Sequence, residues 1–383
     1  MNKSNHLARR VAPAVRRRLQ RRLFAESLET RCMLNADFQL LRDINATSRN
    51  EGSAPADFVA LGNQVFFTAE TQTAGRELWV SDGSSAGTHM LRDFAVGTRD
   101  SAISNLVPYN NRLYFIANSQ LVASDGTDAG TIVFEEFNAA LPPSEINNVI
   151  VFQGELYFAA KKYNANGSLP STRSLWKSDG TPEGTSMLPV AGNPTSLTVM
   201  GGQLFFNSGQ TLWATDGTSA GTTQISPTGM LRPRDLTVAE IFDGVSTEER
   251  LFFTAEDGVH GNELWISDGT PAGTTMVKDI QLENNPSLRN ISDLMGFDGA
   301  LYFSANDGVN GQELWRSDGT EQGTTIVSDI NVNGDANPAW LTVHQGTLFF
   351  TANDGAHGVE LWKLDSSTPP TLVKDINETN SPS

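Results

Sequence analysis

The chain has 383 residues, a net charge of −17 and 34 glycines, a composition that suits many short strands joined by tight turns. Its apolar runs fall short of the roughly 18 residues that a membrane-spanning helix needs, so we expect no transmembrane helix. Cys32 is the single cysteine, which excludes a disulfide within the chain and a cysteine-based zinc site.

The charge is unevenly divided along the chain. Residues 1–36 contain nine Lys or Arg and two Glu; subtracting these from the totals of 27 and 44 leaves 18 basic and 42 acidic residues, a net charge of −24. Such an acidic body is not expected to bind nucleic acid or an anionic membrane. Its charge suits either the attraction of cations or simple solubility.

The basic segment 1–36 lacks the apolar core of an ordinary secretory signal. Within it, residues 24–37 resemble the LEPR-XLL segment found near the start of large exported bacterial proteins. The residues that match are Leu28, Glu29, Arg31, Leu34 and Ala36, and the differences are Thr30, Met33 and Asn35. The resemblance implies an export or targeting arm, disordered or partly helical, and a product at the cell surface or outside the cell. A plain disordered basic tail is the alternative.

From residue 37 onward a unit recurs seven times: L-F-F-T-A, a loop, E-L-W-x-S-D-G-T-x-x-G-T, and a segment ending V-K-D-I. Its turn aspartates recur about every 47 residues, at Asp82, Asp125, Asp179, Asp216, Asp268, Asp318 and Asp365. This period predicts that residues 37–383 form one all-β domain, a seven-bladed β-propeller of four-stranded blades. The alternative is an open β-solenoid, whose rungs usually repeat at about 20–30 residues.

Within each unit four strands are expected in chain order. Residues 235–238 and 340–343 typify the first strand. The second carries two adjacent aromatic residues, such as Phe252 and Phe253, and its unbroken apolar run indicates burial on both faces. The third carries the tryptophan, and the fourth ends in Lys-Asp-Ile, whose charge indicates an outer edge.

Residues 40–45 repeat the fourth-strand pattern ahead of the first unit. We therefore expect the segment 40–44 to lie beside the last blade, at 360–376, and to close the ring. The last unit has its own copy of the pattern at 372–376, and the sequence does not decide between the two.

The motif E-L-W-x-S-D-G-T-x-x-G-T resembles the signature of the ELWxxDGT-repeat proteins of bacteria. Residues 263–274 and 313–324 match it in full, whereas units two to four lack the glutamate and unit two also lacks the tryptophan. The resemblance covers about residues 38–376 and implies the repeat fold and export. It implies no biochemical activity.

Two parts of the repeat could carry chemistry. The S-D-G-T turn is expected to be structural, since its Asp and Thr side chains can hold the turn's own backbone. The loop between strands two and three in the last three units holds carboxylates six residues apart around two glycines, and calcium prefers such oxygen ligands. The predicted calcium ligands are Asp257, Glu263, Asp307, Glu313, Asp354 and Glu360. A plain hairpin whose glutamate pairs with a neighbouring strand is the alternative.

No nucleophile elbow, zinc-protease, phosphate-loop or dinucleotide motif is present. The uniform repeats therefore favour a module that binds an extracellular protein or glycan, or serves as a structural component, over an enzyme. We expect it to be a monomer, and the resemblances imply that it is exported. A propeller hydrolase or lyase that acts on extracellular polysaccharide is the alternative. It would gather unlike polar residues from several blades at the central channel.

Overall fold

The computed structural model describes residues 41–44, 52–134, 145–161, 171–242, 244–280, 291–365 and 368–376. The chain divides into two units, 1–43 and 44–383, and the strands belong to the second. The described residues contain 28 strands in seven antiparallel four-stranded sheets and no helix. The predicted all-β, seven-bladed propeller is confirmed. The expected export arm, 1–36, lies outside the described residues.

Each sheet contains four strands that are consecutive in the sequence. The first strands are β1 (Ala56–Leu61), β5 (Ser104–Tyr109), β9 (Asn147–Phe152), β13 (Thr195–Met200), β17 (Leu231–Phe242), β21 (Ile291–Phe297) and β25 (Ala339–His344). The second strands are β2 (Gln64–Thr71), β6 (Arg112–Ala117), β10 (Glu155–Ala160), β14 (Gln203–Ser208), β18 (Thr247–Glu256), β22 (Ala300–Asn306) and β26 (Thr347–Asn353). The third strands are β3 (Gly75–Ser81), β7 (Gln120–Ser124), β11 (Ser174–Ser178), β15 (Thr211–Thr215), β19 (Asn262–Ser267), β23 (Gln312–Ser317) and β27 (Val359–Asp365). The fourth strands are β4 (His89–Arg92), β8 (Ile132–Val133), β12 (Ser186–Ala191), β16 (Thr223–Gln224), β20 (Thr275–Lys278), β24 (Thr325–Ser328) and β28 (Thr371–Lys374).

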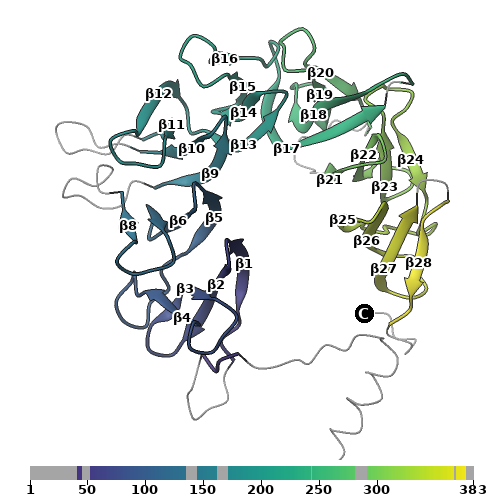
Figure 1. Ribbon diagram of the computed structural model, residues 1–383. Coiled ribbons are helices and arrows are strands. Elements are labelled where there is room, and N and C mark those ends of the chain that lie inside the picture. The colour runs from purple at the N-terminus through teal and green to yellow at the C-terminus, as the bar shows by residue number, and fades with distance from the viewer. Residues whose placement is uncertain are drawn as a thin grey trace, which may run out of the picture. The chain divides into compact units, whose positions relative to one another are not determined.

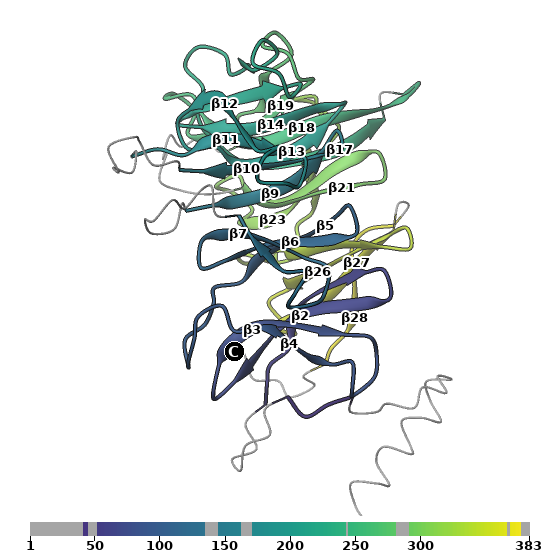
Figure 2. The same cartoon turned by 60° about the vertical axis from the view of Figure 1, so that its left-hand side comes forward.

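The sheets follow one another around a common centre, with the first strand of each sheet innermost and the fourth outermost (Figure 1). Each inner strand packs against the inner strand of the next sheet, from β1 and β5 through to β21 and β25. The turned view shows β9, β13, β17 and β21 in succession (Figure 2). The inner strands thus form a surface that faces the centre.

The hydrophobic core lies between neighbouring sheets. Successive residues of a strand point to opposite faces, so the two aromatic residues of a second strand enter two different interfaces. Phe252 packs with Phe303 and Trp315 of the following sheet, whereas Phe253 packs with Phe205 of the preceding one. This arrangement explains why the second strands are apolar at successive positions: both of their faces are covered.

The motif glutamate ties the first, fifth and sixth sheets to the linkers that lead to the next sheet. In the fifth sheet the buried Glu263 accepts the N–H of Ile280 through Oε2 at 2.8 Å. The side chain of Ile280 packs in the cluster that contains Trp315 of the following sheet. The strand β20 has already ended at Lys278. The Asp-Ile pair therefore belongs to the linker, and its assignment to the fourth strand was wrong.

The same role explains the extra copy near the N-terminus. Residues 41–44 form no strand, and Ile44 packs against Phe67 and Trp79 of the first sheet, as Ile280 packs near Trp315. The last sheet takes its fourth strand, β28, from its own unit. The expected strand pairing of this N-terminal copy with the last blade is wrong for the described residues, because residues 41–44 form no strand and the last sheet is complete with its own four.

The buried tryptophan of the third strand gives a direct test of this core. Trp265 is 6% exposed, and its Nε1 donates to the carbonyl oxygen of Ala255 at 3.1 Å. We expect Trp265→Ala to lower the free energy of unfolding by about 3–5 kcal/mol, because it leaves a cavity between two sheets. Urea unfolding followed by circular dichroism measures this change. The matched control is Trp340→Ala, at an 80% exposed position, which should change stability by less than about 1 kcal/mol. Equal losses in the two variants would contradict the assignment of the core.

Candidate functional site

The S-D-G-T turns are held by their own side chains. In the fifth sheet Asp268 Oδ1 accepts the N–H of Thr270 at 2.8 Å and its hydroxyl at 2.7 Å. These bonds, the hydroxyl bond first, hold the pKa of Asp268 below its usual value. The buried hydroxyls of Ser267 and Thr274 lie 2.7 Å apart and clasp the base of the turn. The motif side chains are thus engaged within the turn, which accords with the predicted structural role.

The loop aspartates also bind their own backbone. Asp257 Oδ1 accepts the N–H groups of Val259 and His260, both at 2.8 Å, and Oδ2 lies 2.7 Å from Nδ1 of His260. Asp307 and Asp354 repeat the two backbone bonds in the next two sheets. In each loop the aspartate stabilises a tight turn.

The loop glutamates serve a different part of the chain. Glu313 is fully buried and accepts the N–H groups of Ile330, at 2.9 Å, and of Ala336, at 3.2 Å. Burial raises its pKa, while the bonds from the backbone lower it, and the net direction is upward. Glu263 makes the corresponding bond to its linker, and Glu360 is buried. The two carboxylates of a loop therefore hold different segments.

This geometry bears on the predicted calcium ligands. Among the residues that the structure describes, no three His, Cys, Asp or Glu side chains are grouped closely enough to hold a metal ion. The sequence pattern had treated the carboxylates of each loop as one set of ligands. The described contacts give them separate backbone partners, and calcium binding stays a prediction.

A different set of residues lies on the inner strands. Near the start of each inner strand, and within the longer β17, two residues stand opposite a single residue of the second strand, which defines a β-bulge. The first bulge residue has a left-handed φ, between 52° and 59°, in all seven sheets. We call these seven residues the bulge ring: Asp57, Asn105, Asn148, Ser196, Asp235, Asp293 and Trp340.

Several polar members of the bulge ring connect neighbouring sheets or accept a hydrogen bond from the second strand of their own sheet. Asp293 Oδ1 accepts the N–H of Trp340 at 2.9 Å, and Asn105 Oδ1 accepts the N–H of Asn148 at 3.2 Å. Asp57 Oδ2 instead accepts the hydroxyl of Thr68 at 2.8 Å. Asn and Asp are the non-glycine residues that adopt a left-handed φ most readily, which explains why they predominate here.

Trp340 departs from this pattern. A bulky residue with a left-handed φ is strained, and such strain tends to persist where function requires it. Its side chain is 80% exposed, so burial in a core does not offset this strain. It is the exposed aromatic member of the bulge ring.

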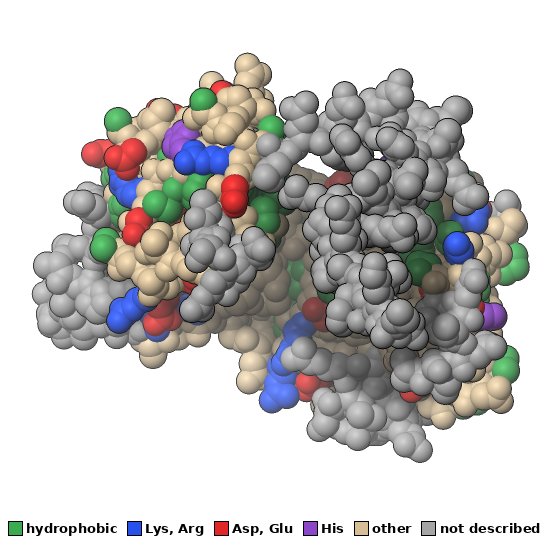
Figure 3. All heavy atoms as spheres, turned by 90° about the horizontal axis from the view of Figure 1, so that it is seen from below, with side chains coloured by type: hydrophobic (Ala, Val, Ile, Leu, Met, Phe, Trp, Pro, Cys, Tyr) green, Lys and Arg blue, Asp and Glu red, His purple; other side chains and the backbone are tan. Residues whose placement is uncertain are grey.

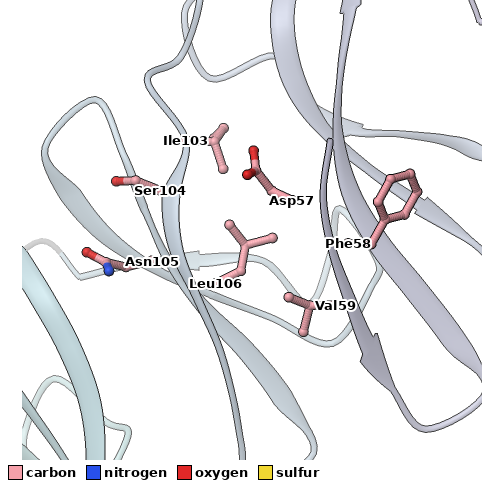
Figure 4. A pocket seen from close by; sticks show the side chains of 7 residues that line it. All are labelled: Asp57, Phe58, Val59, Ile103, Ser104, Asn105 and Leu106. Atoms are coloured by element: carbon pink, nitrogen blue, oxygen red, sulfur yellow. The ribbon is translucent and has the colours of Figure 1, made fainter. Parts of the chain in front are cut away.

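A cavity of about 340 Å³ opens between the inner strands β1 and β5 at this level. In the close-up, the side chains of Asp57, Val59, Ile103 and Leu106 point into the space between the strands, whereas Phe58 points away (Figure 4). The cavity therefore combines one carboxylate with an apolar wall. Its lining residues are Asp57, Phe58, Val59, Ile103, Ser104, Asn105 and Leu106.

The surface seen from below carries acidic and basic side chains next to one another (Figure 3). Charges of both signs are thus interspersed on the described part of this face, although the chain as a whole is acidic. Among the described residues, no helix has the length and apolar character needed to cross a membrane.

Sequence reasoning located the inner strands but missed the bulge ring. The signal was an Asn or Asp directly followed by an apolar residue, as at Asp57, Asn105, Asn148, Asp235 and Asp293. Ser196 and Trp340 interrupt that pattern, so it does not stand out in the repeat.

No protein-family model and no curated protein matches the sequence. Among solved structures, it is similar to puromycin hydrolase (15% identity, TM-score 0.48, 84% of this chain and 53% of that one). It is also similar to a prolyl endopeptidase (11% identity, TM-score 0.49, 83% and 49%) and to a Mycobacterium tuberculosis puromycin-hydrolyzing peptidase (11% identity, TM-score 0.45, 85% and 54%).

These neighbours correct the expected function. The sequence favoured a binding, interaction or structural module that is not an enzyme, with a polysaccharide hydrolase or lyase as the alternative. The structures that the chain resembles are instead named as peptidases and hydrolases of other substrates. The likeness itself concerns the fold, and the chain spans about half the length of those proteins. Uniform repeats were a poor guide because they report packing between sheets rather than chemistry.

The histidine of the loop offers a pH test of the local geometry. The hydrogen bond that His260 makes to the carboxylate of Asp257 raises the pKa of His260, and the bond to Asp354 does the same for His357. A raised folded pKa means that the pair stabilises the fold below the ordinary pKa of 6.5 and that this contribution disappears as the pH rises through the folded value. We expect the substitution Asp257→Asn to lower the pKa of His260 and to leave the pKa of His357 unchanged. An NMR titration of both histidines measures this. A titration of His260 that the variant does not alter would contradict the pairing.

Proposed function

We propose that residues 44–383 form the substrate-admitting part of a hydrolase that acts on peptides, with the bulge ring as the surface that receives an extended peptide segment. Peptide hydrolysis, the activity for which the proteins above are named, enters as part of this proposal. In this chain the proposal is supported by the surface that the first strands of the sheets form around the centre. Export, implied by the resemblance of residues 24–37, is part of the same proposal.

The main chain of the inner strands supports a peptide as the ligand. Each inner strand is the edge of its sheet, so one row of its N–H and C=O groups has no partner within that sheet. A bulge also leaves its extra residue outside the ladder. Extended peptides are recognised through such edge groups, with pockets that receive alternate side chains. The cavity beside Asp57 is suited to one such side chain, a basic or amine-bearing one with an apolar stem.

The single observation that carries the proposal is Trp340. The other six members of the bulge ring have short polar side chains, whereas this position holds an exposed indole on a strained backbone. Exposed aromatic residues supply much of the binding energy in protein interfaces. We assign to Trp340 the contact with an apolar part of the peptide and to Asp235 and Asp293 the attraction of its positive charges.

The proposal assigns bond cleavage to groups beyond this surface, in another domain or chain. The role of residues 44–383 is then to admit and orient the peptide. The affinity for peptide is consequently the quantity to measure in this chain.

The test is Trp340→Asn in the full chain. Asparagine tolerates the left-handed backbone, so we expect the variant to be more stable by up to about 1 kcal/mol. We also expect it to bind a fluorescein-labelled, lysine-containing octapeptide about fivefold or more weakly by fluorescence anisotropy, since losing a central aromatic contact costs more than about 1 kcal/mol. A purely structural tryptophan would give the opposite result for stability.

The matched control is Glu183→Gln, which removes a carboxylate on the exposed turn between β11 and β12 and should leave binding unchanged. A dextran oligosaccharide of similar length should not compete with the peptide. Unaltered peptide affinity in Trp340→Asn, or equal competition by dextran, would overturn the proposal.

A further inference from the structure

The inner strand of the fifth sheet differs from the other six at the position directly before the bulge ring. The pairing register identifies this position in every sheet, as in Ala56 opposite Thr68 and Arg234 opposite Thr254. Six sheets have a short side chain there, and the fifth has an arginine. The packing of the sheets therefore does not require a long cation at this position. The seven residues are Ala56, Ser104, Asn147, Thr195, Arg234, Ser292 and Ala339.

The charge of Arg234 is not neutralised by the part of the chain that the structure describes. The residue is half-buried, and its guanidinium forms no ion pair or hydrogen bond with a described residue. Arg173, by contrast, lies 2.8 Å from a carboxylate oxygen of Glu145. The carboxylate of Asp235, the next residue in the chain, accepts the hydroxyl of Thr254 at 3.2 Å. The N–H groups of Arg234, which form a planar fork that fits a carboxylate, are thus available to a ligand.

A second arginine lies two residues earlier on the same strand. The register of β17 shifts a second time between Leu231 and Arg234, and Arg232 within that shift has a left-handed φ of 53°. Its N–H donates to the carbonyl oxygen of Gln210 in the preceding sheet at 3.0 Å, which holds this strained backbone in place. Its side chain is 53% exposed and lies 3.4 Å from Glu256. Such a long, exposed ion pair leaves much of its charge available.

The surroundings determine which kind of anion suits these arginines. Residues 37–383 contain 18 basic and 42 acidic residues, and the bulge ring itself holds Asp57, Asp235 and Asp293. A polyanion such as nucleic acid would be repelled by this charge. A single carboxylate on a chain that also carries positive groups would meet favourable partners of both signs. A peptide with a free carboxyl terminus is such a ligand.

We propose that Arg234 binds the C-terminal carboxylate of a peptide and that Arg232 adds positive charge beside it. This inference rests on the proposed function, because it takes the peptide received by the bulge ring as the ligand. The aspartates of the bulge ring attract the positive groups of the peptide, and Arg234 holds its last residue. The two together fix the direction of the peptide and restrict the substrate class to peptides with a free carboxyl terminus.

The first measurement compares three unlabelled forms of one lysine-containing octapeptide by isothermal titration calorimetry with the full, unaltered chain. The first form has a free carboxyl terminus and no Asp or Glu, the second has a C-terminal amide, and the third has the amide and one internal glutamate. We expect both amides to bind about tenfold or more weakly, because they lack the charge-assisted bonds to the terminus. The acidic charge of the chain would by itself favour the more positive amide, so this preference reports a local contact.

The second measurement assigns that preference to a residue. Arg234→Gln should bind the free-carboxylate form about tenfold more weakly and should distinguish it from the amide by less than about twofold. Arg234→Lys should retain an intermediate preference, because an ammonium group keeps the charge but lacks the planar fork. The matched control is Arg250→Gln, which removes the same charge from an ion pair with Glu248 in the same sheet. It should keep the tenfold preference.

Each contrary result has a separate meaning. Equal binding of the free acid and the amide by the unaltered chain would overturn the carboxylate contact and leave peptide binding in place. Equal binding of the free acid and the glutamate-containing amide would overturn the assignment to the chain terminus. A preference that persists in Arg234→Gln would overturn the role of this residue. Absence of binding by all three peptides would overturn the proposed function and this inference with it. The first comparison needs no variant, so it is decisive even if Arg234→Gln does not fold.

Discussion

The whole arrangement depends on the packing of side chains between neighbouring sheets. A second strand with two adjacent aromatic residues places one ring in each of two interfaces. A sheet that lies between two others is therefore held on both of its faces. A single four-stranded sheet could not bury these rings by itself. Stability is therefore shared among interfaces, as in repeat proteins generally, and an unfilled interface concentrates exposed apolar surface at one place.

This constraint gives the sequence motif a physical meaning. The tryptophan fills an interface, and the serine, aspartate and threonine hold a turn at the edge of the sheet. The glutamate binds the linker whose isoleucine or phenylalanine enters the next interface: Glu77 accepts the N–H of Phe94 at 3.3 Å, and Phe94 packs edge-on against Phe115. The motif thus encodes the junction between two sheets. Of the loop carboxylates that suggested a calcium site, Glu263 and Glu313 belong to that junction, whereas the aspartates hold their own turns.

Much of the fold could be predicted from the sequence, because burial on both faces leaves a continuous apolar run and the turn residues recur at a fixed period. The assignment of the Asp-Ile pair failed because a strand end and a linker have the same composition. What distinguishes them is the hydrogen bond from the N–H of Ile280 to Glu263. The bulge ring was missed for a related reason. A left-handed φ favours Asn and Asp, but the register shift that defines a bulge depends on the partner strand. The exposure of Phe349 and Leu361 in the last sheet could not be foreseen, since they have the same residue types as buried members of the repeat.

The residues of the bulge ring share a backbone conformation but differ in their side chains. All seven have a left-handed φ, and Trp340 differs most from the others because its side chain is a large, exposed aromatic group. Function in such a scaffold lies where the repeat departs from itself, which is why a motif shared by most units said little about activity. The proposed handling of peptides uses these departures and the unpaired edges of the inner strands.

The central claim, that neighbouring sheets are coupled through their facing side chains, is tested most directly by a double-mutant cycle on unfolding free energy. The cycle combines Phe252→Leu with Phe303→Leu, which share one interface cluster. The reference cycle combines Phe252→Leu with Phe205→Leu, which belong to different clusters. The account predicts a coupling energy of about 0.5–3 kcal/mol for the first pair and additivity within about 0.5 kcal/mol for the second. Additive effects in the first pair, or equal coupling in both, would contradict it.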